Sequence, residues 1–133
     1  MTAAMLDWVL IVDDEAMIRE NLKAYLEDEG LQVAAFEAVT PALDWLQCGG
    51  SCRLCIMDMR LPDMDGNTAI RLLHQRYPQM TFLIHTGSSS YTLPEDLRAM
   101  GLDDHCVYHK PLTDMGPLAA EVRARALTRE RRP

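Results

Sequence analysis

Short, uninterrupted apolar runs alternate along the chain with longer segments in which apolar residues recur every three or four positions. A short apolar run that ends at a turn is typical of a β-strand buried on both faces, whereas the longer period is typical of an amphipathic helix. We therefore predict β-strands at residues 8–12, 31–36, 53–57, 80–84 and 105–109. We predict helices at residues 15–29, 40–47, 67–77, 94–100 and 112–127, with Thr40 as the N-cap of the second.

This alternation of strands and helices predicts an α/β fold in which a parallel sheet is covered by helices on both faces. Because crossovers between parallel strands are right-handed, few topologies remain, and we expect a flavodoxin-like, doubly wound sheet with the strand order 2-1-3-4-5. Residues 1–133 are predicted to form a single domain with a core at about 8–127. The arginine-rich tail, residues 123–133, is either the frayed end of the last helix or the start of a linker.

The composition is that of an ordinary globular protein, with 48% hydrophobic and 25% charged residues. The formal net charge of −7 argues against nucleic acid as a direct partner, because binding to phosphates needs a basic surface. No apolar run approaches the ~18 residues that span a bilayer, and residues 1–8 lack the basic and apolar segments of a signal peptide. We therefore expect a cytoplasmic protein without a membrane partner.

Four cysteines raise the question of a metal site, since Cys48, Cys52 and Cys55 are close in sequence while Cys106 is distant. Successive strand residues face opposite sides of a sheet, so Cys52 and Cys55, three positions apart, are expected to point away from each other. We predict reduced thiols packed as small hydrophobic side chains. The four histidines also lack the spacing of metal ligands and are interpreted as ordinary.

Polar side chains stand where the predicted strands end. Asp13 and Asp14 follow the first strand, Asp58 follows the third, Thr86 the fourth and Lys110 the fifth. Since the carboxyl ends of parallel strands lie along one edge of a sheet, we expect these five side chains to converge. Each has an ordinary explanation by itself, such as a helix cap for the first two aspartates, but unrelated surface residues would not all fall at strand ends.

The three carboxylates predict a site for a hard divalent cation. Carboxylates brought together repel one another unless a cation lies among them, and oxygen ligands are those that Mg²⁺ prefers. An aspartate can also act as a nucleophile toward a phosphoryl donor and form an aspartyl phosphate. A lysine and a hydroxyl then stabilise the phosphoryl oxygens. The strand ends therefore hold the parts of a phosphoryl-transfer site.

Four motifs carry these side chains: Asp13-Asp14-Glu15, the segment Asp-Met-Arg-Leu-Pro-Asp-Met-Asp-Gly at 58–66, Thr86-Gly87, and Lys110-Pro111. In these motifs and over residues 8–127, the chain resembles the receiver domains of bacterial two-component response regulators, the CheY-like superfamily. The acidic pair by itself is weak evidence. The segment 58–66 is far more specific, and the ordered set at the strand ends is strong.

The resemblance implies that Asp58 is the phosphoacceptor. It also implies that Mg²⁺, with Mn²⁺ as a substitute, binds directly to Asp14 and Asp58 and through a water to Asp13. The backbone carbonyl of Arg60 completes the protein ligands in this family.

The resemblance further implies that Lys110, Thr86 and Gly87 bind the phosphoryl group, with Thr86 moving toward it as a switch. Pro111 is expected to follow a cis peptide bond. An aromatic switch residue usually lies three positions before the lysine, where this chain has Val107, and the neighbouring Tyr108 is expected to face the opposite side of the sheet. The segment before the lysine is also about two residues longer than usual, which predicts either an extended loop or a bulge in the fifth strand.

The function that the resemblance implies is a switch rather than an enzyme, limited at most to its own phosphorylation and dephosphorylation. A pseudo-receiver that acts as a constitutive interaction module is the alternative. A phosphohydrolase is disfavoured, because such enzymes generally have an acid two residues after the nucleophile, where this chain has Arg60.

The expected partners are a sensor histidine kinase or a phosphotransfer protein as phosphoryl donor, and an output domain or target protein. Phosphorylation is expected to change the surface formed by the fourth helix, the fifth strand and the fifth helix, through which a phosphorylation-dependent homodimer is one outcome. The sequence names neither the kinase nor the signal nor the output, and it leaves open whether the chain is full-length or an N-terminal part of a longer protein.

Overall fold

The computed structural model describes residues 8–130, with side chains described for residues 8–125. The strands are β1 (Trp8–Val12), β2 (Val33–Phe36), β3 (Cys52–Asp58), β4 (Thr81–Thr86) and β5 (Val107–His109). The helices are α1 (Ala16–Asp28), α2 (Val39–Gln47), α3 (Gly66–Arg76), α4 (Glu95–Ala99) and α5 (Gly116–Glu130), and a short 3-10 helix, η1 (Asp104–Cys106), precedes β5. None of the helices within these described residues is both long and apolar enough to cross a membrane.

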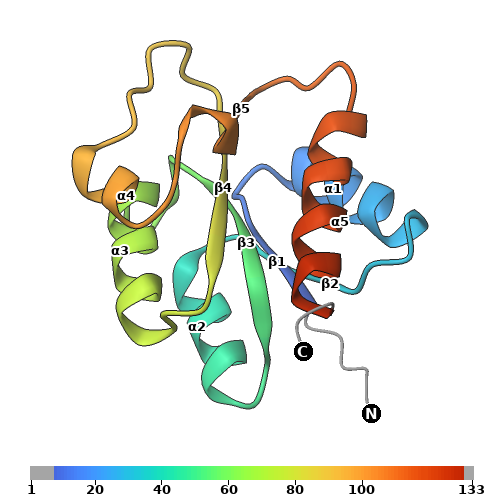
Figure 1. Cartoon of the computed structure of the whole chain (residues 1–133), viewed down its shortest axis with the longest axis horizontal. Helices are drawn as coiled ribbons and strands as arrows, with labels where there is room; N and C mark the ends of the chain where they lie inside the picture. Colours follow the sequence, from blue (N-terminus) through green and yellow to red (C-terminus); the bar gives the residue numbers. More distant parts are fainter. Residues whose placement is uncertain (1–7, 131–133) are drawn as a thin grey trace.

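The five strands form one parallel sheet in the order β2-β1-β3-β4-β5. In Figure 1, α1 and α5 cover one face of the sheet, and α2, α3 and α4 cover the other. This is the doubly wound, flavodoxin-like arrangement that the sequence predicts. The strand order reverses at β1 and β3, so the carboxyl ends of these two strands border the crevice where open α/β sheets bind ligands.

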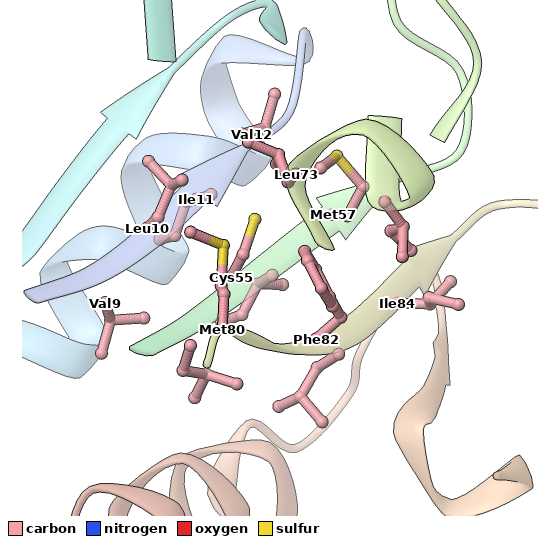
Figure 2. Close-up of a cluster of buried hydrophobic side chains, with 14 of the residues drawn as sticks. Val9, Leu10, Ile11, Val12, Cys55, Met57, Leu73, Met80, Phe82 and Ile84 are labelled. Atoms are coloured by element: carbon pink, nitrogen blue, oxygen red, sulfur yellow. The ribbon is translucent and has the colours of Figure 1, made fainter. Parts of the chain in front are cut away.

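Apolar side chains cover both faces of the sheet. Leu10, Ile56, Phe82 and Ile84 on the strands are almost completely buried, and Leu73 of α3 belongs to the same cluster (Figure 2). Burying an apolar side chain of this size stabilises a fold by about 1.5–3 kcal/mol relative to leaving it exposed. Burial on both faces is the reason why the strands have continuous apolar runs rather than alternating ones.

β5 is shorter than the sequence predicts. It begins at Val107 rather than His105, because residues 104–106 form η1. The side chain of Asp103 caps this turn and accepts a hydrogen bond from the backbone N–H of His105 at 2.9 Å. Hydrogen bonds between an aspartate side chain and the nearby backbone compete with regular structure, which delays the start of the strand.

α5 also begins later than predicted, at Gly116 rather than Leu112. The Asp114 side chain accepts a hydrogen bond from the Gly116 N–H at 2.8 Å, immediately before the first helical turn. The helix runs to Glu130, so most of the predicted tail belongs to it, while residues 131–133 lie outside the described part of the chain. The other ends of the elements lie within two residues of the predicted positions.

The N-cap of α2 differs from the predicted one. The helix begins at Val39, and the cap position is occupied by Ala38, whose side chain cannot accept a hydrogen bond. The carboxylate of Asp63 accepts instead from the backbone N–H groups of Val39 and Thr40, at 3.2 and 2.8 Å. The predicted cap, Thr40, lies in the first turn, and its hydroxyl donates to the same carboxylate at 2.8 Å.

The register between β1 and β3 shifts by one residue directly after Trp8, where β3 has an additional residue. Cys52 pairs with Trp8 and Cys55 pairs with Leu10, so Cys52 and Cys55 lie on the same face of the sheet. The prediction that they point to opposite faces is therefore wrong. No disulfide joins the four cysteines, and Cys55 and Cys106 are buried as predicted, whereas Cys52 is only partly buried and Cys48 is exposed.

Candidate functional site

The predicted site residues meet at the carboxyl edge of the sheet. Asp13 follows β1, Asp58 ends β3, Thr86 ends β4 and Lys110 follows β5. These four strands are consecutive neighbours in the sheet, so their ends stand side by side (Figure 1). Asp13, Asp58 and Thr86 are 2–4% exposed, which excludes an ordinary surface location for them.

Asp13, Asp14 and Asp58 form a cluster of three carboxylates. One oxygen from each lies within 4.8 Å of the others, which is close enough to hold one ion, and no cysteine or histidine within the described residues belongs to such a group. The Asp13 carboxylate accepts a hydrogen bond from the backbone N–H of Glu15 at 2.9 Å, which orients it. Three carboxylates without nitrogen or sulfur ligands fit a hard cation such as Mg²⁺.

The environment of Asp58 disfavours its charged form. Burial and the neighbouring charge of Asp13 raise the pKa of Asp58 to about 6, although Lys110 and the backbone N–H of Arg60 act in the opposite direction. That N–H lies 3.4 Å from Asp58 Oδ1. Lys110 and the nearby N–H group therefore compensate the negative charge of the cluster only in part. A divalent cation among these oxygens would stabilise the charged form of Asp58.

The ammonium group of Lys110 lies among carboxylates. Its Nζ is 2.6 Å from Glu15 Oε1, 3.1 Å from Asp13 Oδ2 and 3.3 Å from Asp58 Oδ2. Burial lowers the pKa of Lys110, but hydrogen bonds to Glu15 and Asp13 and the charges of Asp13 and Asp58 raise it more, so the net shift is upward. The backbone N–H of Lys110 donates to the Thr86 carbonyl at 2.8 Å, which holds the lysine at the end of β4.

Thr86 and Gly87 begin the turn after β4. The Thr86 hydroxyl accepts a hydrogen bond from the backbone N–H of Ser88 at 3.1 Å. A Cβ at Gly87 would meet no atom within 4 Å, so steric crowding does not explain the glycine. On the neighbouring strand end, the peptide bond between Lys110 and Pro111 is cis, as the resemblance implies.

The loop after β3 packs closely against Asp58. The Gly66 N–H donates to the Met59 carbonyl at 2.9 Å, and Arg60 pairs with Asp65 in an isolated antiparallel bridge. A Cβ at Gly66 would overlap the Asp58 carbonyl oxygen, so this position requires glycine. This packing fixes the backbone of Arg60 beside the carboxylate cluster.

Val107 and Tyr108 lie on opposite faces of the sheet. Tyr108 pairs with His85 in a regular β4–β5 register, and Thr86, one position further along β4, therefore faces the other side. Tyr108 thus points away from the Thr86 face, as predicted, and Val107 occupies that face. The additional residues before Lys110 lie in the loop that contains η1 and not in a bulge within β5.

Sequence reasoning missed three residues at or near the site. Glu15 is 95 positions from its contact, Lys110, and only its place beside the acidic pair could have drawn notice. The sequence pattern indicates no special role for His85, yet it is 4% exposed, and its two ring nitrogens are buried without a hydrogen-bond partner. Asp63 lies inside the 58–66 motif, but no local pattern relates it to α2.

Comparisons with known proteins agree with this geometry. A family model described as "Response regulator receiver domain" matches residues 9–121. The transcriptional regulatory protein GltR of Pseudomonas aeruginosa is 37% identical over 99 residues, which are 71% of this chain and 38% of that protein. AruR, a transcriptional regulatory protein of the same organism, is 36% identical over 117 residues, which are 82% of this chain and 45% of that protein. The chain thus spans less than half the length of these relatives.

A solved structure of a related protein with a bound metal ion gives a further comparison. The response regulator TrrA of Thermotoga maritima, in complex with Mg²⁺ and beryllium fluoride, has a TM-score of 0.73 to this chain and 26% sequence identity. The superposition covers 90% of this chain and 98% of that one. The likeness therefore extends over nearly the whole fold.

Proposed function

The chain belongs to the response regulator receiver domain family, and from this premise we propose that Asp58 accepts a phosphoryl group in a Mg²⁺-dependent reaction. The observation that carries the proposal is the position of the Lys110 ammonium, within 3.3 Å of both Asp13 and Asp58. A fixed cation beside a buried carboxylate cluster is suited to charge that develops during phosphoryl transfer.

The proposed reaction is an in-line displacement. An Asp58 carboxylate oxygen forms a bond to phosphorus while the bond from phosphorus to the donor atom breaks, and the donor leaves with the electron pair of that bond. Lys110 would then bind the phosphoryl oxygens. Thr86 would donate its hydroxyl to one of these oxygens, and the Gly87 backbone leaves room for the approach.

The metal site that we propose consists of Asp14 and Asp58 as direct ligands, Asp13 through a water, and the Arg60 carbonyl. Mg²⁺, or Mn²⁺ in its place, would neutralise the phosphoryl oxygens when bound. Two features support this site: the raised pKa of Asp58, about 6, and the Mg²⁺ bound by the related TrrA.

A constitutive interaction module is the second candidate. It is favoured by Val107, which offers no aromatic ring on the face that Thr86 shares, so the coupling that the family usually makes through this position would be absent. Under this second hypothesis, the carboxylate cluster binds Mg²⁺, but phosphorylation does not alter the surface formed by α4, β5 and α5.

The donor that we propose is a sensor histidine kinase or a phosphotransfer protein, and the recipient of the signal is an output domain or a target protein. The related GltR and AruR are transcriptional regulatory proteins. By analogy, an output domain linked to α5 would bind DNA, and this acidic domain would not contact the DNA itself. We place the domain in the cytoplasm and take residues 8–127 as its approximate core. Dimerisation through the α4–β5–α5 surface would appear as a concentration-dependent increase in size after phosphorylation.

The test is the intact mass after incubation with Mg²⁺ and acetyl phosphate. We expect a gain of one phosphoryl group in the unmodified chain and in Asp28→Asn, an exposed aspartate at the end of α1, and no gain in Asp58→Asn or with EDTA. A gain that persists in Asp58→Asn would contradict the assignment of the acceptor. No gain in any variant, with Mg²⁺ still bound, would favour the interaction module.

A further inference from the structure

Among the described carboxylates that contact Lys110, only Glu15 lies outside the carboxylate cluster. Its Oε1 lies 2.6 Å from Lys110 Nζ, closer than the oxygens of Asp13 and Asp58 at 3.1 and 3.3 Å. Its side chain is 56% exposed, whereas those of Asp13 and Asp58 are 3% and 5% exposed. Glu15 therefore contacts the lysine from the solvent-exposed side, and the two aspartates contact it from the buried side.

The lysine ammonium already has three carboxylate partners in this arrangement. It donates a hydrogen bond to Glu15 at 2.6 Å and forms ion pairs with Asp13 and Asp58 at 3.1 and 3.3 Å. A phosphoryl group on Asp58 would add negative charge and three acceptor oxygens at the same place. These oxygens would therefore compete with the existing partners for the same ammonium group.

Glu15 is the partner that can be released at the lowest cost. A carboxylate that is more than half exposed regains its hydration when it leaves, whereas the buried aspartates cannot. Its release would not disturb α1, because Glu15 occupies the N-cap position without making a side-chain capping hydrogen bond.

We propose that Glu15 is a positioning residue that competes with the phosphoryl group for Lys110 and thereby weakens and slows phosphorylation of Asp58. This inference rests on the proposed function. In the unphosphorylated domain, Glu15 keeps the Lys110 ammonium group toward the solvent-exposed side of the site. During phosphorylation, the lysine exchanges the Glu15 carboxylate for phosphoryl oxygens.

Two substitutions separate the contact from the charge. Glu15→Asp keeps the negative charge but is one methylene shorter, so it no longer reaches Nζ from the same backbone position. Glu15→Gln keeps the length and an acceptor oxygen but removes the charge. Glu20→Gln is the matched control. Glu20 is an exposed acid in α1, the helix that begins directly after Glu15, and its side chain pairs with Arg19.

The measurements are the rate of phosphorylation by acetyl phosphate and the equilibrium affinity for beryllium fluoride, both at Mg²⁺ concentrations that saturate each variant. We expect Glu15→Asp and Glu15→Gln to increase both quantities about two- to fivefold, the effect of losing one exposed ion pair, and Glu20→Gln to change neither. The ¹⁵N signal of Lys110 Nζ should shift in both Glu15 variants before any phosphodonor is added, and thermal unfolding should remain unchanged.

The outcomes distinguish this inference from the proposed function. If the unmodified chain gains no phosphoryl group, both fail. If it is phosphorylated but both Glu15 variants match it, the competition alone is refuted. An increase in Glu15→Gln without one in Glu15→Asp, or an equal increase in Glu20→Gln, would attribute the effect to the general electrostatic field and would also refute the competition for Lys110.

Discussion

Asp58 and His85 are neighbours on β3 and β4, and each is 4% exposed. Burial favours the uncharged form of both. It raises the pKa of Asp58 to about 6, with a further contribution from the charge of Asp13, and it lowers the pKa of His85 to about 4, with a further contribution from Lys110. At neutral pH the domain therefore contains a neutral imidazole whose ring nitrogens lack partners, next to a carboxylate that needs a cation.

His85→Leu tests the first of these statements. The folded pKa of His85, about 4, lies below the ordinary value of 6.5, so the unfolded chain binds more protons between these values. The contribution of His85 to stability is complete above pH 6.5 and is lost as the pH falls toward 4. From pH 7 to pH 5, the free energy of unfolding of the unmodified chain should decrease by about 1–2 kcal/mol relative to that of His85→Leu, as measured by urea denaturation.

The exposed His109 on β5 provides the control for this experiment. His109→Leu makes the same change of side chain at an exposed position, and Asp58 cancels because it titrates in both proteins. If the stabilities of the unmodified chain and His85→Leu change in parallel between pH 7 and pH 5, the buried imidazole is not neutral.

At the scale of elements, the loop between β3 and α3 connects the carboxylate cluster to two helices. Asp65 caps α3 and accepts a hydrogen bond from the Thr68 N–H at 2.9 Å. Asp63 accepts from the first turn of α2, 24 positions earlier in the chain. Burial raises the pKa of Asp63, but its hydrogen bonds to Thr40 and Val39 lower it more. One acidic loop therefore stabilises the N-termini of two helices and the backbone beside Asp58.

Asp63→Ala removes the partner of the α2 N-terminus. We expect the free energy of unfolding to decrease by about 0.5–2 kcal/mol, the usual contribution of an N-cap. Hydrogen exchange at the amides of Val39 and Thr40 should accelerate, while the amide of Thr68 in α3 keeps its protection. Asp65→Ala should give the converse pattern. Unchanged exchange at Val39 and Thr40 in Asp63→Ala would show that solvent satisfies these amides equally well.

At the scale of the whole molecule, the sheet order brings together groups that are far apart in sequence. Asp13 and Lys110 come from opposite ends of the chain, yet their strands are separated in the sheet only by β3 and β4. The apolar cluster of Figure 2 includes residues of β1, β3 and β4 and holds these strands together. The folded domain therefore concentrates negative charge at one edge, and binding of a cation there is linked to the stability of the whole fold.

Mg²⁺ should accordingly stabilise the domain against urea. At a tenfold excess over its dissociation constant, an ion that binds only the folded state adds about 1.4 kcal/mol to the free energy of unfolding. Without Mg²⁺ the order should differ: Asp58→Asn should be more stable than the unmodified chain by about 1–2 kcal/mol at pH 7, because it removes the charge that burial disfavours.

The stability gain from Mg²⁺ should be strongly reduced in Asp58→Asn and absent when NaCl of equal ionic strength replaces MgCl₂. The effect of Asp58→Asn without Mg²⁺ should disappear as the pH falls from about 6 to about 4, since the native carboxyl is then protonated as well. An equal gain from Mg²⁺ in both proteins would contradict a metal site at Asp58.

The class of fold, the strand order and the residues at the strand ends all follow from local patterns in the sequence. Hydrophobic periodicity reports directly which positions must be buried, and it is a local property that neighbouring residues share. The right-handed crossover rule then restricts how the predicted elements connect. Asp13, Asp58, Thr86 and Lys110 were therefore placed correctly along the sheet edge before any contact was known.

Contacts between residues that are distant in sequence depend instead on how the whole chain packs. The contact of Glu15 with Lys110, the cap that Asp63 provides to α2 and the burial of His85 depend on how loops and strands lie against one another. The shift of register after Trp8 and the 3-10 turn before β5 changed which side chains share a face. Periodicity cannot encode these details, because strand register and loop path are determined by packing of the whole chain.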